Sequence, residues 1–141
     1  MMNRSYFKKL ETHDNNLPLE LTTVIDQLAF NEKGLIPVIT QDAISKNVLM
    51  FAWMSKESLY LTIQTKHMTY WSRSRNCLWV KGKSSGHTQS LTSMAFDCDG
   101  DVILCQVEQV GAACHTGRRD CFYLNVDLDK SKVTVTGQAT L

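Results

Sequence analysis

The sequence lacks a surplus of either charge. Its 15 Lys and Arg residues balance 14 Asp and Glu residues, which leaves a formal net charge of +1. Such a chain has no global field that attracts nucleic acid or an anionic membrane, so any anion site must be a local cluster. Internal repeats and low-complexity stretches are also missing, and the content of 43% hydrophobic and 21% charged residues is ordinary. This composition excludes a disordered chain, a collagen-like repeat and an isolated coiled coil.

Long apolar segments are missing as well. No run approaches the ~20 residues that span a bilayer. Residues 1–10 contain three basic side chains without a following apolar segment, unlike a secretory signal. The five cysteines are an odd number, and with no export signal this argues for a reducing compartment and against a disulfide framework. We therefore expect a cytoplasmic protein whose clustered cysteines bind metal or act in catalysis.

With 141 residues, and only 2 prolines and 7 glycines to interrupt it, the chain has the length of one domain. We expect an N-terminal arm and weak helix over residues 1–30, the functional domain over residues 31–126, and a C-terminal strand or tail over residues 127–141. Within the arm, residues 1–19 are polar and aperiodic and predict a loose segment, and residues 20–33 predict a short helix that ends near Gly34.

One further helix is well signalled, and the rest of the chain is β-rich. Ser55 is a suitable N-cap for a helix over residues 56–66, with Met54 and Leu59 as a hydrophobic staple. Pro37 favours an edge or a first strand position, and Asp99-Gly100 favours a two-residue hairpin. The expected fold is mostly β (α+β): a folded antiparallel or mixed sheet, barrel-like, with one or two short helices. Strands are expected over residues 35–40, 48–53, 68–74, 78–81, 88–98, 102–110, 121–126 and 132–136.

Three carboxylates, those of Asp97, Asp99 and Asp101, are spaced two residues apart. If this segment is extended, all three point to one side and Cys98 points to the other. A solvated hairpin tip and an oxygen site for Mg²⁺ both fit this pattern. A calcium loop does not, because the glycine required at its sixth position is replaced by Val102.

Cys114 and Cys121 bracket a loop that contains Gly117, Arg118 and Arg119. Because C-x-x-C pairs are absent, zinc ribbons and thioredoxin-like redox motifs are excluded. Arginines beside a thiol favour the thiolate that a metal requires.

Cys98 could supply a third thiolate. Three thiolates with an open position are typical of catalytic zinc, and four closed thiolates of structural zinc. For Cys77 and Cys105, whose neighbours are apolar, the default interpretation is a small buried side chain.

A basic segment rich in Gly and Ser, residues 70–75 and 81–87, surrounds Trp79. It is not a P-loop, because Cys77 stands where that motif needs its first glycine. Its guanidinium groups, hydroxyls and glycine-flanked N–H groups suit phosphate oxygens. An exposed basic hairpin and a surface for single-stranded RNA, with Trp71 and Trp79 stacking on bases, remain alternatives.

Six ordered blocks stand out together, at residues 48–54, 70–75, 78–79 with 81–82, 85–89, 97–101, and 114–117 with 121–122. With these blocks the chain resembles phosphoribosyl-AMP cyclohydrolases, the histidine-pathway enzymes that open the adenine ring of N1-phosphoribosyl-AMP. The resemblance covers about residues 34–123. With eighteen residues after Tyr123, the chain resembles the form without a second, pyrophosphohydrolase domain.

The resemblance implies hydrolysis of the N1–C6 bond of 1-(5-phosphoribosyl)-AMP to the phosphoribosyl-formimino-aminoimidazole carboxamide ribotide, the third step of L-histidine biosynthesis. It also implies an intertwined homodimer whose zinc ligands come from both chains, with one zinc and one magnesium ion per subunit. The implied ligands are Cys98, Cys114 and Cys121 for zinc and Asp97, Asp99 and Asp101 for magnesium.

The sequence offers one candidate general base and several candidate substrate contacts. His115 follows Cys114 directly, and imidazole titrates near neutral pH. The alternative function is a non-catalytic, zinc-stabilised nucleotide- or RNA-binding module that recruits Cys105 or Cys77 as a fourth ligand. The candidate contacts to the substrate are Trp71, Arg73, Arg75, Lys81, Ser85, His87, Arg118 and Arg119.

Overall fold

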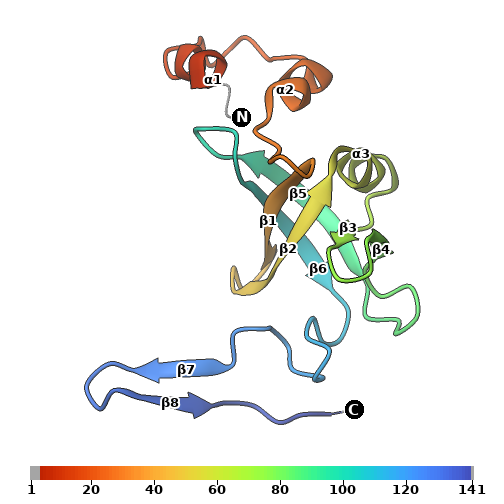
Figure 1. The fold of residues 1–141 in the computed structure, drawn as a ribbon, viewed down its shortest axis with the longest axis vertical. Helices are drawn as coiled ribbons and strands as arrows, with labels where there is room; N and C mark the ends of the chain where they lie inside the picture. The colour runs from red at the N-terminus through yellow and green to blue at the C-terminus, as the bar shows by residue number, and fades with distance from the viewer. Residues whose placement is uncertain (1–3, 141) are drawn as a thin grey trace.

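The computed structural model describes residues 4–140, which contain three helices and eight strands (Figure 1). Among these residues, no helix has the length and apolar character needed to cross a membrane. The elements in chain order are α1 (Arg4–Leu10), α2 (Leu21–Gln27), β1 (Leu35–Asp42), β2 (Val48–Ser55), α3 (Lys56–Thr65), β3 (Thr69–Ser72), β4 (Cys77–Val80), β5 (Gln89–Phe96), β6 (Ile103–Gln109), β7 (Leu124–Asp127) and β8 (Lys132–Val135).

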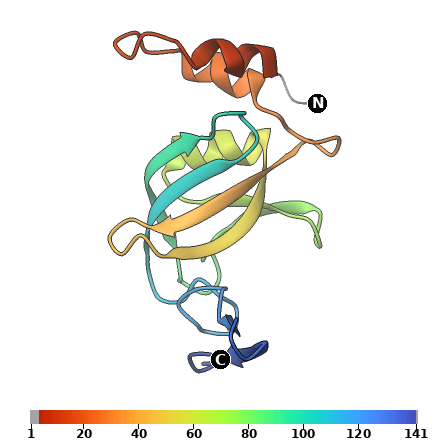
Figure 2. The ribbon, with the colours of Figure 1, turned by 90° about the vertical axis from the view of Figure 1, so that its left-hand side faces the viewer.

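A four-stranded mixed sheet in the order β2-β1-β6-β5 forms the centre of the molecule. The pairs β1–β2 and β5–β6 are antiparallel, and β1 and β6 run parallel. The strands β3–β4 and β7–β8 form two separate hairpins (Figures 1 and 2). The prediction of a mostly β fold with a mixed sheet is confirmed. The barrel-like closure is wrong, because β2 and β5 are the edges of an open sheet and residues 4–140 form no closed barrel.

Pro37 lies inside a central strand, which differs from the expected edge or first position. It lies opposite Trp53 of β2, but the pairing between β1 and β6 begins only at the next residue, with Val38 opposite Ile103. Pro37 is therefore outside the β1–β6 ladder, where a residue without an N–H group is tolerated.

The helix α3 confirms the capping signal. The Ser55 hydroxyl accepts a hydrogen bond from the Ser58 N–H at 3.1 Å, and the Ser58 hydroxyl accepts one from the Ser55 N–H at 2.8 Å. Met54 and Leu59 are both fully buried, as the hydrophobic staple requires. The helix ends at Thr65, and the C-cap residue Lys66 takes a left-handed conformation.

The N-terminal segment is more ordered than expected. Residues 4–10 form α1, where a loose segment is predicted, so the structure has three helices rather than one or two. Residues 1–3 of that segment lie outside the described residues. Phe7 of α1 is only 5% exposed, although its neighbours Ser5, Lys8 and Lys9 are exposed. Tyr6 and Leu10 of α1 are partly buried and pack against the core beside Phe7. The helix has only seven residues, which is too short for a reliable periodic signal in the sequence.

The C-terminal hairpin β7–β8 projects from the rest of the molecule (Figure 1). Each strand carries two exposed apolar side chains: Leu124, Val126, Val133 and Val135 have exposed fractions between 57% and 63%. A two-stranded hairpin without cover is marginally stable by itself. This hairpin therefore presents an apolar surface that another protein surface can bury.

A line of fully buried polar side chains crosses the core between β1, β3 and β5. The Tyr70 hydroxyl donates its single proton to the Gln89 carbonyl oxygen at 2.6 Å. It therefore accepts the hydrogen bond that joins it to the Thr40 hydroxyl at 2.7 Å. The Gln89 amide donates to Gln109 at 2.8 Å, and Gln109 donates to the Val110 carbonyl at 3.0 Å. These bonds connect the centre of the core to the loop that follows β6.

Replacing Tyr70 with Phe leaves the Thr40 hydroxyl and the Gln89 carbonyl oxygen buried without this partner. We expect the free energy of unfolding to fall by about 1–3 kcal/mol, measured by urea denaturation. Tyr60→Phe, at a half-buried position of α3, is the matched control and should change it by less than about 0.5 kcal/mol. Equal effects of the two substitutions would show that the buried line does not stabilise the fold.

Candidate active site

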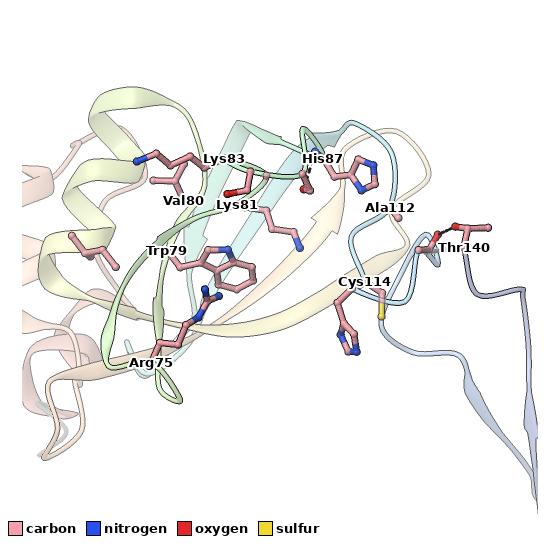
Figure 3. Close-up of a pocket in the computed structure, with 15 residues that line it drawn as sticks. Arg75, Trp79, Val80, Lys81, Lys83, His87, Ala112, Cys114 and Thr140 are labelled. Atoms are coloured by element: carbon pink, nitrogen blue, oxygen red, sulfur yellow. Dashed lines mark hydrogen bonds between the residues drawn. The ribbon is translucent and has the colours of Figure 1, made fainter.

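A cavity of about 650 Å³ lies between β4, the loop of residues 81–87 and the loop that follows β6. Figure 3 shows side chains of both loops around it, with Lys81 extending toward the loop of Cys114. The cavity brings together two sequence features that were predicted separately, the basic Gly/Ser segment and the cysteine motif. Six of the predicted site residues line it: Arg75, Lys81, Ser85, His87, Cys114 and His115.

Cys114 and Cys121 face each other across the cysteine loop, which we define as residues 113–121. Burial raises the pKa of the Cys114 thiol, but hydrogen bonds from Thr116 and Cys121 and the charge of Arg118 hold it below its ordinary value. The Thr116 hydroxyl donates to the Cys114 sulfur at 3.1 Å. Burial, together with the neighbouring Cys114, raises the pKa of Cys121 to about 11.

The Cys114 thiol is therefore the more acidic of the two, because its pKa is lowered while that of Cys121 is raised. Zinc binds cysteines as thiolates, so binding releases the protons that the thiols carry. The chemistry of this donor pair fits zinc, with two of the three predicted ligands in place.

Lys81 joins the basic segment to the cysteine loop. Its ammonium group donates to the Ala113 carbonyl oxygen at 2.5 Å and lies 5.0 Å from the centre of the Trp79 ring. Burial lowers the pKa of Lys81, while the nearby thiols of Cys121 and Cys114 act in the opposite direction. Lys81 thus places its amino group inside the cavity, beside the sulfur pair.

The two arginines of the cysteine loop are engaged elsewhere in this chain. The Arg119 guanidinium forms an ion pair with Asp42 and also donates to the Gly111 carbonyl at 3.1 Å. Hydrogen bonds from the backbone of Ser45 and Ile44, and then Arg119, hold the pKa of Asp42 below its ordinary value. This pair anchors the cysteine loop to the end of β1.

Arg118 and Arg73 each lie over an aromatic ring. Arg118 lies 4.0 Å from the centre of the Tyr123 ring and donates to the Thr136 carbonyl oxygen at 2.8 Å. Arg73 lies 4.9 Å from the centre of the Trp53 ring. Neither arginine is among the residues that line the cavity, and the same holds for Arg119 and Trp71.

The acidic turn, residues 97–101, is bent rather than extended. The Asp97 carboxylate accepts hydrogen bonds from the N–H groups of Asp101 at 2.8 Å and Val102 at 3.1 Å. The turn is also wider than the predicted two-residue hairpin, because the backbone pair that closes it joins Asp97 to Val102. The predicted alternation is wrong: the Cys98 thiol lies within 4.8 Å of the carboxylates of Asp97 and Asp99.

The carboxylates of the acidic turn crowd one another. A hydrogen bond to Asp97, then burial and the charges of Asp97 and Asp99, raise the pKa of Asp101. Burial acts to raise the pKa of Asp97 as well, but bonds from Asp101 and from backbone N–H groups hold it below its ordinary value. A divalent cation would relieve this repulsion, so the oxygen donors fit Mg²⁺.

The strand β6 separates the acidic turn from the cysteine pair. Cys98 precedes this strand and Cys114 follows it, and the two loops lie at opposite ends of the sheet (Figure 1). Seven residues of extended chain span about 20 Å or more. Cys98 therefore cannot join Cys114 and Cys121 around one ion within this chain.

Two contributors to the site escaped the sequence analysis. Thr116, which bonds to the Cys114 sulfur, is a hydroxyl residue two positions after a candidate ligand, and that spacing is a usable signal. Asp42 lies 77 positions from its partner Arg119, and no local pattern connects them.

Comparison with known proteins gives a consistent result. The family model described as phosphoribosyl-AMP cyclohydrolase matches residues 50–123. A phosphoribosyl-AMP cyclohydrolase of Roseobacter denitrificans is 54% identical over 101 residues, which are 72% of this chain and 79% of the relative. One of Alcanivorax borkumensis is 46% identical over 132 residues, 90% of this chain and 93% of the relative. A histidine biosynthesis bifunctional protein of Prochlorococcus marinus is 57% identical over 104 residues, 73% of this chain and 46% of the relative.

Proposed function

Because this chain belongs to the phosphoribosyl-AMP cyclohydrolase family, we propose that it hydrolyses the N1–C6 bond of the adenine ring in 1-(5-phosphoribosyl)-AMP, a cytoplasmic step of histidine biosynthesis. The observation that carries this proposal is the shared cavity, whose wall joins the basic loop of residues 81–87 to Cys114 and His115. Cations for substrate phosphates thus lie beside a sulfur pair suited to a catalytic metal.

Zinc is the metal that suits the cysteines. We assign it to Cys114 and Cys121 of one chain and Cys98 of another. When bound by three thiolates with an open position, zinc acts as a Lewis acid and makes a water molecule more acidic. The role of this chain's residues is to present the thiolates, and Thr116, Lys81 and Arg118 favour that charge state by hydrogen bonding or positive charge.

A second copy of the chain is the natural source of Cys98. The length of β6 keeps it away from the sulfur pair of its own chain, and Cys98 itself is exposed. The exposed apolar hairpin β7–β8 directly follows the cysteine loop, and Phe51 on the edge strand β2 is 50% exposed. Burial of these surfaces in a homodimer would stabilise it and bring the acidic turn of one copy to the cysteine loop of the other.

Magnesium is the ion that suits the acidic turn, with Asp97, Asp99 and Asp101 as its ligands. It would neutralise the carboxylates and provide a positive charge for a substrate phosphate. One such ion and one zinc ion per subunit complete the proposed cofactors.

The substrate contacts divide into two groups. Arg75, Lys81, Ser85 and His87 line the cavity and are assigned to direct binding of the nucleotide. Arg73, Arg118, Arg119 and Trp71 are placed outside it within one chain, so we assign any contact they make to the completed dimer. In the reaction, the imidazole of His115, exposed at the cavity wall, accepts the proton of the water that attacks C6.

The alternative of a non-catalytic zinc module is weaker. Its fourth thiolate would be Cys105 or Cys77. Cys105 is fully buried in β6, and burial raises the pKa of its thiol to about 12. Cys77 is exposed on β4, outside the cavity lining.

The zinc assignment predicts the effect of each cysteine substitution. Purified protein should contain about one zinc per chain, and Cys98→Ser, Cys114→Ser and Cys121→Ser should each lose both zinc and activity. Cys77→Ser should keep both. Metal analysis together with a ring-opening assay checks this, and full zinc content in Cys98→Ser would contradict the assignment.

The role of His115 predicts a large effect on turnover. His115→Ala should lower kcat by ~10²–10⁴-fold, the usual range for loss of a general base, while zinc content and thermal stability stay unchanged. Added imidazole should restore part of the rate. His67→Ala, at an exposed position outside the cavity lining, is the control and should keep full activity. A fall in kcat of less than about tenfold for His115→Ala would assign the base to another group, and His87 would be tested next.

A further inference from the structure

The helix α1 lies against the acidic turn, although it is far from that turn in sequence. Both views of the ribbon place the N-terminal helices at the end of the sheet where β5 turns into β6 (Figures 1 and 2). This helix lies outside residues 50–123, which the family model matches. Its contact with the turn therefore joins a segment outside the matched residues to one inside them.

The contact is made by Phe7 and Gly100. Phe7 is 5% exposed, and its ring lies so close to Gly100 that a Cβ atom there would overlap the ring carbons. Gly100 also has a φ of +68°, which side-chain-bearing residues rarely adopt. The turn can take its observed shape against α1 only with glycine at this position.

A second contact holds the same residue from the backbone. The Ala29 N–H, just after α2, donates to the Gly100 carbonyl oxygen at 2.8 Å. The Gly100 N–H in turn donates to the Asp97 carbonyl oxygen at 3.0 Å. Phe7 and Ala29 thus fix the position of Gly100, which lies between Asp99 and Asp101. Because Gly100 bonds to Asp97, they also hold the turn closed at that residue.

The same helix borders Cys98. A hollow of about 310 Å³ is lined by Phe7 and Leu10 of α1 together with Phe96, Asp97 and Cys98. The N-terminal helix therefore forms one wall of the space next to the acidic turn.

We propose that Phe7 is a positioning residue that holds the acidic turn in the shape that binds a divalent cation. The inference rests on the magnesium role proposed above for this turn. Crowded carboxylates repel one another, so without a support they spread apart before an ion binds. Phe7 and Ala29 provide that support in advance and reduce the ordering that binding requires.

The test uses the full-length dialysed protein and MgCl₂ as the probe. Phe7→Ala should weaken Mg²⁺ binding, measured by calorimetry, by about tenfold or more, the range found when groups that orient metal ligands are removed. The N–H groups of Asp101 and Val102, which bond to the Asp97 carboxylate, should exchange their hydrogens faster without the metal. Phe7→Leu keeps most of the apolar contact and should show smaller changes in Mg²⁺ affinity and in amide exchange. This variant still tests the proposal if Phe7→Ala does not fold.

Two control variants separate positioning from general loss of stability. Lys8→Ala changes an exposed position of the same helix, and Leu59→Ala truncates a fully buried side chain in α3. Both should keep wild-type Mg²⁺ affinity and wild-type exchange at Asp101 and Val102. Equal weakening of Mg²⁺ binding by Leu59→Ala and Phe7→Ala would overturn the proposal.

The outcomes also distinguish this inference from the proposed magnesium role. Unchanged Mg²⁺ affinity and unchanged amide exchange in the Phe7 variants would overturn the inference while leaving the metal site intact. If the wild-type protein binds no Mg²⁺, the magnesium role fails. The amide exchange of Asp101 and Val102 alone then decides whether Phe7 positions the turn.

Discussion

The length of β6 is the constraint on which the chemistry of this protein depends. This strand is paired on both sides, with β1 and with β5, so it cannot bend to bring its ends together. The acidic turn with Cys98 therefore stays at one end of the sheet, and Cys114 and Cys121 stay at the other. Under the zinc assignment proposed above, a single chain holds two parts of the metal site without completing it. A second copy would complete the site, and the exposed apolar hairpin beside the cysteine loop is the surface we propose for its binding.

Each part of the site is held by contacts with distant segments of the fold. The cysteine loop is fixed by the ion pair of Arg119 with Asp42 and by the bond from Lys81 to the Ala113 carbonyl. The acidic turn is fixed by its own hydrogen bonds to Asp97 and by the N-terminal segment. The groups that we assign to metal and substrate are thereby placed in advance, which lowers the free-energy cost of ordering them on binding.

The sequence predicted those features whose signals are local. The cap at Ser55, the strands β1 and β2 and the mostly β class depend on neighbouring residues, and the structure confirms them. The conformation of the acidic turn was predicted wrongly. The Asp97 carboxylate accepts backbone hydrogen bonds that favour a bent turn over an extended strand, and the spacing of the aspartates does not show which conformation is more stable. The helix α1 and the role of Asp42 depend on partners far along the chain, at Gly100 and Arg119. The central position of β1 follows from its parallel pairing with β6, a long-range choice that no periodicity encodes.

The central claim is that the cysteines of one active site come from two chains, and subunit complementation tests it most directly. Cys98→Ser and Cys114→Ser chains, each inactive alone, are unfolded together, refolded with zinc and assayed for ring opening. In a mixed dimer, one site pairs the intact Cys98 of one chain with the intact Cys114 and Cys121 of the other. Random pairing of equal amounts predicts about a quarter of the wild-type activity, since half of the closed dimers are mixed and each has one complete site. An inactive mixture, with wild-type protein recovering fully under the same treatment, would contradict the claim.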